Sequence, residues 1–294
     1  MRLLIAFVSV VVIWSTTPLA IKWSSDGVSF IFSVATRMTL GAMLCLLILT
    51  IGERKLPLHR EAIVTYIVAG LGIYGAMSCV YWGSQYISSG LVAVVFGLTP
   101  IVTAVMAHQW LGENSVTPGK IFAVLLGLMG ISIIFKSNLS VGGQTYYGIV
   151  AMLVAVLIHA GSGIWIKRVG VSLSALELTS GALLFVSPAF ILTWYLLDGE
   201  IPVNISFKAV VAISYLGFIG SVIGFTLYYY ILKNMAISKV ALITLVTPIL
   251  ALLLGQQVNS EYIPNDVWYG TTFIIIALLF HQWGDRLLVR FNPN

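Results

Sequence analysis

The residue in this sequence best able to bind a charged solute is Arg37, which lies inside an apolar stretch. It is the only charged residue between Asp26 and Glu53. A guanidinium at such a place in a bilayer costs about 2.5–3.5 kcal/mol unless neighbouring groups satisfy it. The functional interpretation is a contact with a substrate carboxylate or phosphate. The structural interpretation is a cation held by backbone carbonyls or a helix C-terminus, and the sequence leaves both open.

Polar and aromatic residues at helical spacing form three further candidate surfaces. They are Ser78, Tyr81, Trp82 and Gln85 on the first surface, Trp14 and Thr17 on the second, and His159 and Ser162 on the third. Spacings of three and four residues place side chains on one helix face. Because polar groups that face lipid are costly, we expect these faces to look inward. The open alternatives are an interfacial aromatic belt for the first surface and hydrogen-bonded packing for His159.

Two prolines and two glutamates stand at corresponding places in two apolar stretches. Pro100 and Pro248 each follow a threonine, and a proline inside a helix removes a backbone hydrogen bond and kinks the helix. Kinks at matching positions of two halves indicate a transport site, with a packing kink as the alternative. Glu113 and Glu261 end the two stretches. We expect them to be interfacial anchors or gate partners, with proton coupling as the alternative.

Motifs for covalent or metal chemistry are absent from the sequence. HExxH, DxxxD, GxSxG and CxxC do not occur, and the histidines of the apolar stretches have no ligand spacing. Cys45 and Cys79 each lie within an apolar stretch, which is typical of small buried residues. We therefore expect no catalytic residue, no metal and no cofactor. A membrane-embedded enzyme that acts on lipid or peptide is kept as the alternative function.

The composition indicates a bilayer as the solvent of this chain. Of 294 residues, 59% are hydrophobic and 9% are charged, and the mean hydropathy is +1.02. A soluble domain carries about a quarter charged residues. The formal charge of +5 is spread over single and paired basic residues rather than a patch, so we expect no binding to nucleic acid.

Apolar runs near the length of about 20 residues that crosses a bilayer recur along the chain. Their ranges are 3–21, 27–52, 62–84, 91–112, 121–135, 146–166, 178–197, 209–232, 240–258 and 267–284. Only helices satisfy their own backbone hydrogen bonds in lipid, apart from closed barrels, whose alternating pattern is absent here. The sequence therefore predicts an all-α integral membrane protein of ten transmembrane helices, the first of them retained.

The distribution of Lys and Arg predicts the orientation. With a cytoplasmic N-terminus, eleven of the 15 basic residues lie inside, three lie outside, and Arg37 lies within a span. Those outside are Lys22, Lys136 and Lys208. The positive-inside rule then places both termini in the cytoplasm of a multi-pass plasma (inner) membrane protein.

The second half of the chain repeats the first. A shift of 148 residues aligns 81–113 with 229–261 without a gap and matches Tyr81 with Tyr229, Thr99 with Thr247, Pro100 with Pro248 and Glu113 with Glu261. A shift of 145 residues aligns 13–22 with 158–167. The period covers five predicted helices, and an odd number inverts the second copy in the membrane. Inverted repeats are typical of secondary transporters.

Two stretches of this chain resemble the two EamA-type repeats of the drug/metabolite transporter superfamily. The first extends from 91–100 through 111–113, and the second from 238–248 through Glu261. Arg37 and the segment 228–232 also resemble this family. The resemblance implies one repeat over 1–137 and another over 138–294, ten helices, and a central cavity open to one side at a time. It also implies export or exchange of amino acids, their derivatives, nucleobases or similar metabolites. One departure is Asn259-Ser260 before Glu261, where the family usually has glycine before the acid.

These observations predict a secondary transporter whose partners are a small-molecule substrate and the lipid bilayer. The expected substrate-binding residues are Trp14, Thr17, Arg37, Ser78, Tyr81, Trp82, Thr99, His159, Tyr229 and Thr247. The expected helix-break and gate residues are Pro100, Pro248 and Glu113. The oligomeric state does not follow from the sequence.

Overall fold

Helices make up the fold in this computed structural model, which describes residues 2–111, 117–139, 144–170, 172–235, 240 and 243–291. The first half comprises α1 (Arg2–Ser24), α2 (Phe30–Ile51), α3 (Arg60–Gly83), α4 (Ser89–Phe96), α5 (Thr99–Leu111) and α6 (Pro118–Leu139). The second half comprises α7 (Thr145–Val169), α8 (Ala175–Leu197), α9 (Phe207–Tyr215), η1 (Leu216–Ile223), α10 (Gly224–Asn234), α12 (Ile243–Asn259) and α13 (Asn265–Phe291). No strand occurs in the described ranges, so the prediction of an all-α protein is confirmed there.

Seven segments of the described chain are long and apolar enough to cross a membrane. They are Arg2–Ser24, Phe30–Ile51, Arg60–Gly83, Ser89–Trp110, Thr145–Val169, Ala175–Leu197 and Phe207–Asn234. The predicted run at 121–135 is a shorter apolar helix within α6, and the last two predicted runs lie in α12 and α13. The chain is therefore a multi-pass membrane protein.

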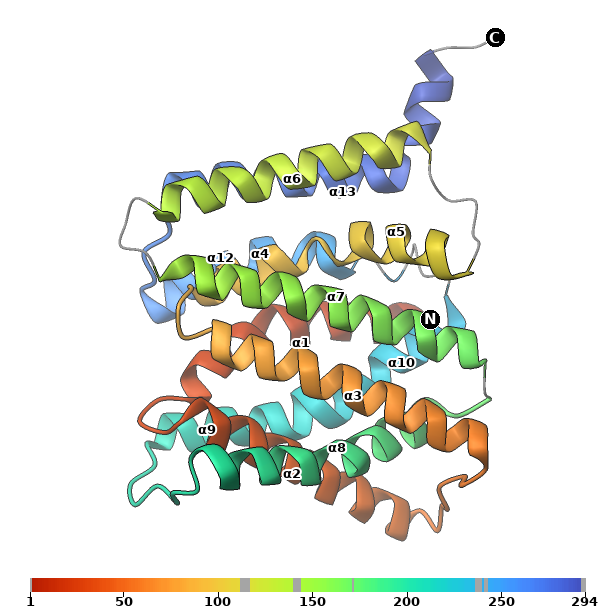
Figure 1. Ribbon diagram of the computed structural model, residues 1–294, viewed down its shortest axis with the longest axis vertical. Helices are drawn as coiled ribbons and strands as arrows, with labels where there is room; N and C mark the ends of the chain where they lie inside the picture. Colours follow the sequence, from red (N-terminus) through yellow and green to blue (C-terminus); the bar gives the residue numbers. More distant parts are fainter. Residues whose placement is uncertain are drawn as a thin grey trace.

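The helices run side by side in a stack, as Figure 1 shows. The pair α6 and α13 forms one end of the stack, while α2, α8 and α9 form the other. Between these ends, α1 packs against α12, α10 and α9, and α7 packs against α3 and α5. The central helices α1 and α7 thus each pack mainly against helices of the other half of the chain.

Two interruptions divide helices that the sequence predicts as continuous runs. The fourth run is split between α4 and α5, and Pro100 is the second residue of α5, a position where the missing N–H costs no intrahelical bond. The eighth run contains η1, a π-helix whose wider turns recur at functional sites. The expected kink at Pro100 is therefore a break at Gly97 and Leu98, just before the proline.

Glycines allow α6 and α13 to touch through their backbones. A Cβ placed on Gly130 would lie 2.6 Å from the carbonyl oxygen of Gly270, and a Cβ on Gly270 would lie 2.6 Å from that of Gly130. Small residues at helix interfaces permit such close approach in membranes, where packing rather than hydrophobic burial drives helix association.

We expect Gly130→Ala and Gly270→Ala each to lower the thermal midpoint in detergent, because overpacking against backbone costs about 1–3 kcal/mol. Thermal unfolding of the purified protein measures this effect. Gly161→Ala is the matched control, since its Cβ would meet its nearest neighbour, Met106 Cε, at an ordinary 3.4 Å. Equal midpoints for all three variants would contradict the backbone contact.

Candidate functional site

Arg37 lies on α2 and is buried, with 2% of its surface exposed. Its Nε donates a hydrogen bond to Ser221 Oγ of η1 at 3.0 Å, and its Nη1 donates one to Tyr81 Oη of α3 at 3.4 Å. Its Nη2 lies 3.2 Å from the place a Cβ on Gly220 would take. The guanidinium therefore joins three helical segments, and the π-helix gives it both a hydroxyl acceptor and space.

Hydroxyl groups, rather than acids, satisfy this cation. No carboxylate of the described residues lies within 4.0 Å of the Arg37 guanidinium nitrogens. The Tyr81 ring adds a cation–π contact, with its centroid 5.9 Å from the guanidinium carbon. A buried guanidinium without a carboxylate partner keeps its positive charge available to an anionic group.

Four aromatic rings meet at the centre of the stack in an aromatic cluster formed by Trp14 of α1, Phe96 of α4, His159 of α7 and Tyr228 of α10. Ring centroids are 5.9 Å apart for Trp14 and His159, 5.1 Å for Trp14 and Tyr228, 5.4 Å for His159 and Tyr228, and 6.2 Å for Phe96 and His159. Edge-to-face and offset pairs at these distances are favourable. The cluster joins both halves of the chain.

A small cavity of about 20 Å³ lies beside His159 and Tyr228, large enough for one water molecule. Its wall includes Ile166 and Tyr229, which also line a larger cavity of about 380 Å³. We call this larger one the Lys167 cavity, because Lys167 and Lys233 line it. The aromatic cluster is thus separated from the Lys167 cavity, at the end of α7, by the side chains of Ile166 and Tyr229 that both cavities share.

A polar cavity of about 370 Å³, which we call the Lys22 cavity, lies at the opposite end of α3. Its lining includes Lys22, Asp26, Gln85, Lys208 and Asn259. Gln85 follows the end of α3, whereas the Lys167 cavity includes Thr65 near the start of that helix. The two cavities therefore open at opposite ends of the same helices.

Comparison with known proteins identifies the family to which the chain belongs. The family model for the EamA-like transporter family matches residues 1–136 and 146–281. The chain belongs to the EamA-like transporter family. Its function is therefore that of a membrane transporter, and the family points away from an enzyme.

Relatives of this EamA-like chain match over nearly their whole length. The uncharacterized transporter YoaV of Bacillus subtilis is 23% identical, over 96% of this chain and 97% of the relative. The uncharacterized inner membrane transporter YedA of Escherichia coli is 22% identical, over 96% of this chain and 91% of the relative. A crystal structure with 17% identity has a TM-score of 0.72 and covers 97% of this chain and 99% of that chain, a likeness in fold alone.

Glu261 of this EamA-like transporter closes a contact between the halves. Its Oε2 accepts hydrogen bonds from the backbone N and the Oγ of Ser89, both at 2.9 Å, at the first turn of α4. Its Oε1 accepts one from Asn259 Nδ2 at 2.8 Å and lies 3.9 Å from Lys22 Nζ. An acid at a helix N-terminus interacts favourably with the helix dipole. Glu113 lies outside the described residues.

We expect Glu261→Gln to lower the thermal midpoint and to destabilise the start of α4 by about 1–2 kcal/mol, because a neutral amide loses the charge–dipole interaction. Thermal unfolding with transport as a second readout measures this. Glu200→Gln is the control, since Glu200 is exposed and does not cap a helix. A Glu261→Gln midpoint equal to that of Glu200→Gln would contradict the capping role.

The structure brings some of the predicted site residues together and places others apart. Trp14, His159 and Tyr229 lie at or beside the aromatic cluster, and Tyr81 contacts Arg37. Trp82 instead packs with Tyr86 and Tyr147, at centroid distances of 5.1 and 6.3 Å, and is 37% exposed.

Of the predicted threonines and prolines, Thr99 and Pro100 begin α5 at the break after α4, whereas Thr17 lies within α1 and Thr247 and Pro248 lie within α12. The hydroxyl of Thr17 donates to the carbonyl of Ile13 within α1, and the hydroxyl of Thr99 donates across the break to the carbonyl of Phe96, the last residue of α4. Thr247 is buried, and Ser78 is half-buried. Pro248 Cγ lies 3.4 Å from the place a Cβ on Gly97 would take, so the break between α4 and α5 meets the proline of α12.

Sequence reasoning missed Phe96 and the roles of Ser221 and Ser89. Phe96 precedes the break between α4 and α5, and a phenylalanine in an apolar run carries no signal of its own. Only the family resemblance of the segment 228–232 draws attention to Tyr228. One signal was present, however: Trp14 and His159 are aligned by the shift of 145 residues, and in the structure their rings touch.

Proposed function

We propose that this chain is a secondary transporter that exports or exchanges small metabolites, such as amino acids or their derivatives, by alternating access. The observation that carries the proposal is the aromatic cluster between two cavities at opposite helix ends. A solute that reaches the cluster from either end would cross the bilayer without covalent chemistry.

We further propose ten membrane crossings in two inverted five-helix repeats, 1–137 and 138–294. The helix contacts support this arrangement. If the two halves are exchanged, α1 corresponds to α7, and the contact of α1 with α10 becomes the contact of α7 with α3. In the same way, the contact of α1 with α12 becomes the contact of α7 with α5. The pairs α2–α8 and α6–α13 are each related to themselves. The two separate ranges matched by the family model also support it.

The two cavities also correspond under the repeat. Lys22 corresponds to Lys167 by the shift of 145, and Gln85 corresponds to Lys233 by the shift of 148. In each pair, the first residue lines the Lys22 cavity and the second lines the Lys167 cavity. Equivalent cavities at opposite membrane faces are what two inverted repeats produce when each contributes one entrance.

The halves differ at the paired tyrosines. Tyr81 is fully buried against Arg37, whereas Tyr229, the residue at the corresponding position of the second half, lines the Lys167 cavity. The position that corresponds to Arg37 by the shift of 145 is Ala182, so the second half has no such arginine. We propose that this conformation is open toward the Lys167 cavity and closed at Arg37.

The proposed substrate class follows from the walls of the site. Aromatic rings with few charges suit a small solute that has both apolar and hydrogen-bonding parts, and Arg37 would attract its carboxylate. We propose Trp14, His159 and Tyr229 as direct contacts, with Thr17, Ser78, Thr99 and Thr247 as further polar lining. Pro100, Pro248 and Glu113 would act at the gates.

Transport into proteoliposomes tests the function. Purified protein is reconstituted and tested with labelled amino acids and other metabolites, with and without a pH gradient. We expect saturable uptake or exchange of at least one neutral amino acid or derivative above that of protein-free vesicles. Uptake of none of a broad panel, in either direction, would contradict the proposed substrate class.

We expect both termini to be cytoplasmic in the inner membrane. The distribution of Lys and Arg supports this, and the start of α1 and the end of α13 lie at the same side of the helix stack (Figure 1). Reporter fusions at Asn294 and within the loop 137–145 should report opposite sides. Finding both reporters on one side would rule out the proposed topology together with the inverted repeat.

A further inference from the structure

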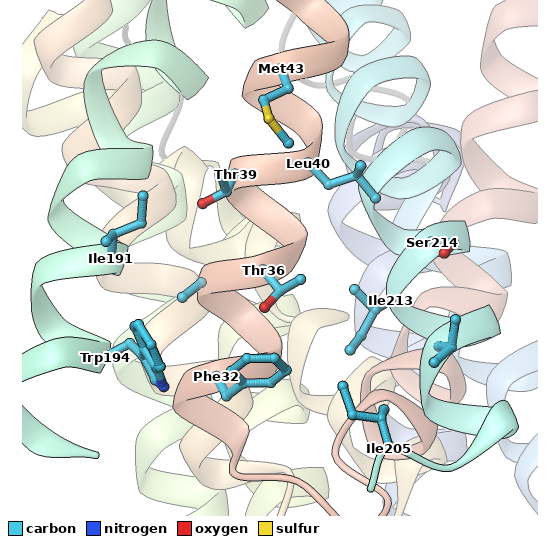
Figure 2. Close-up of a pocket in the computed structure, with 12 residues that line it drawn as sticks. Phe32, Thr36, Thr39, Leu40, Met43, Ile191, Trp194, Ile205, Ile213 and Ser214 are labelled. Carbon is cyan, nitrogen blue, oxygen red and sulfur yellow. The ribbon is translucent and has the colours of Figure 1, made fainter. Parts of the chain in front are cut away.

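A groove on the outer face of the stack is lined by α2, α8 and α9 and has a volume of about 530 Å³ (Figure 2). Its wall is almost wholly apolar, and Met43, Ile191 and Val210 on it are exposed. These helices are candidate membrane spans, so the groove faces the hydrocarbon of the bilayer rather than water.

The groove has the length of one lipid leaflet. Along α2 its lining extends from Phe32, near the start of the helix, to Met43. At 1.5 Å per residue these eleven steps span about 16 Å, which is close to half of the roughly 30 Å hydrocarbon core. A helix of a second copy would cross the whole core, whereas a single acyl chain ends where the groove ends.

The groove begins at the membrane interface, where its rim is polar and acidic. Ser29 Oγ at the start of α2 donates to Asp198 Oδ2 at the end of α8, and Ser206 Oγ before α9 donates to Asp26 Oδ2 at 3.2 Å. In the loop that joins α8 to α9, Val203 is 94% exposed. An exposed apolar residue in the loop that follows Asp198 fits the headgroup region of a bilayer.

Lys208 adds the opposite charge to this rim, with its Nζ 4.9 Å from the centroid of the Trp23 ring. The rim therefore carries both signs, because Lys208 and Lys22 line the same polar cavity as Asp26. A headgroup that has an ammonium as well as a phosphate matches this pattern, because each of its charges meets a group of opposite sign, whereas an anionic headgroup leaves the two carboxylates without a cation of the lipid.

Two polar groups of the wall, Thr39 Oγ1 and Trp194 Nε1, also lack a partner among the described residues. Trp194 Nε1 is covered and has no hydrogen-bond acceptor among the described residues. Figure 2 shows its ring at the same end of the groove as Phe32, and their centroids lie 6.0 Å apart. Indole N–H groups near a bilayer interface pair with the polar part of lipids, and a turn of the ring would offer this N–H to an ester carbonyl.

We propose that this groove binds one acyl chain of a phospholipid with a headgroup ammonium, such as phosphatidylethanolamine, whose amine lies by Asp198 and Asp26. The proposal needs only the membrane location of the chain and is independent of transport.

Lipid retention tests the proposal. The protein is reconstituted in nanodiscs of equal phosphatidylethanolamine and phosphatidylglycerol, extracted in mild detergent and examined by native mass spectrometry. We expect one phosphatidylethanolamine retained per chain, about tenfold over phosphatidylglycerol. Thr36→Trp, which fills the groove, should abolish retention, and Asp198→Asn should remove the headgroup preference.

Two variants serve as controls. Leu128→Trp, on an exposed position of α6, and Asp266→Asn, on an exposed position of α13, should retain the lipid as the parent protein does. If Thr36→Trp fails to fold, Ser214→Trp on the α9 wall replaces it. Three results would each overturn the proposal. The first is that a folded variant with a tryptophan in the groove retains as much lipid as the parent protein. The others are that the parent protein retains both lipids equally, or that a dimeric mass appears in place of bound lipid.

Discussion

Arg37→Ala is expected to reduce transport by at least about 100-fold. Two hydrogen bonds from a charged donor contribute about 1.5–3 kcal/mol each, and 1.4 kcal/mol corresponds to a factor of ten. The substitution also leaves Ser221 and Tyr81 without their partner in a buried place. Initial rates in proteoliposomes, normalised to folded protein, measure the loss. Arg37→Lys should recover only part of the activity, because it lacks the planar fork.

A double-mutant cycle distinguishes this role from general loss of packing. Ser221→Ala alone should reduce transport by about tenfold, and adding it to Arg37→Ala should cost nothing further, because the shared bond is already lost. Arg54→Ala is the control, since Arg54 is exposed in the loop before α3. Normal transport by Arg37→Ala at normal abundance would mean that the arginine is merely tolerated in its place.

Trp14→Ala and His159→Ala are each expected to reduce transport by at least about tenfold. Truncating a packed aromatic residue costs about 3–5 kcal/mol in contacts, and both rings belong to the proposed substrate site. Trp14→Phe should retain much of the activity, because a ring still faces His159. Initial rates over a range of substrate concentrations should show an increased KM.

Trp82→Ala is the matched control, because Trp82 packs with Tyr86 and Tyr147 away from the aromatic cluster. Cysteine substitution gives an independent measurement, in a background without Cys45 and Cys79. Cysteines at positions 14, 78 and 159 should react with an impermeant thiol reagent, and substrate should slow the reaction. If all three are unreactive from both sides and the alanine variants transport normally, the cavity has been placed wrongly.

The sequence predicts helices well here because length and apolarity decide whether a segment crosses a bilayer. It predicts less well which side of a helix faces inward. Tyr81 and Trp82 share one predicted face, yet Tyr81 is buried against Arg37 while Trp82 meets the aromatic residues near the helix end. Neighbouring positions on a helix differ by about 100°, and only the partners of the helix decide between them.

Contacts between distant segments were beyond the sequence. Neither the spacing of Ser89 nor that of Glu261 indicates that the acid caps α4. The π-helix was also invisible, because its residues form an apolar, glycine-containing run like any other in the chain. The hydroxyl partners of Arg37 were missed for the same reason, since one of them lies in that π-helix.

The π-helix η1 has a geometric consequence for the residues that follow it. A π-helical turn contains about one residue more than an α-helical turn. Conversion of η1 to regular α-helix would therefore rotate α10 by about 100° relative to α9 and shift it by about 1.5 Å. Such a rotation is the difference between adjacent residues, so it would exchange Tyr228 and Tyr229 at the aromatic cluster. Arg37 donates to Ser221 within η1, so the same conversion would also alter this hydrogen bond.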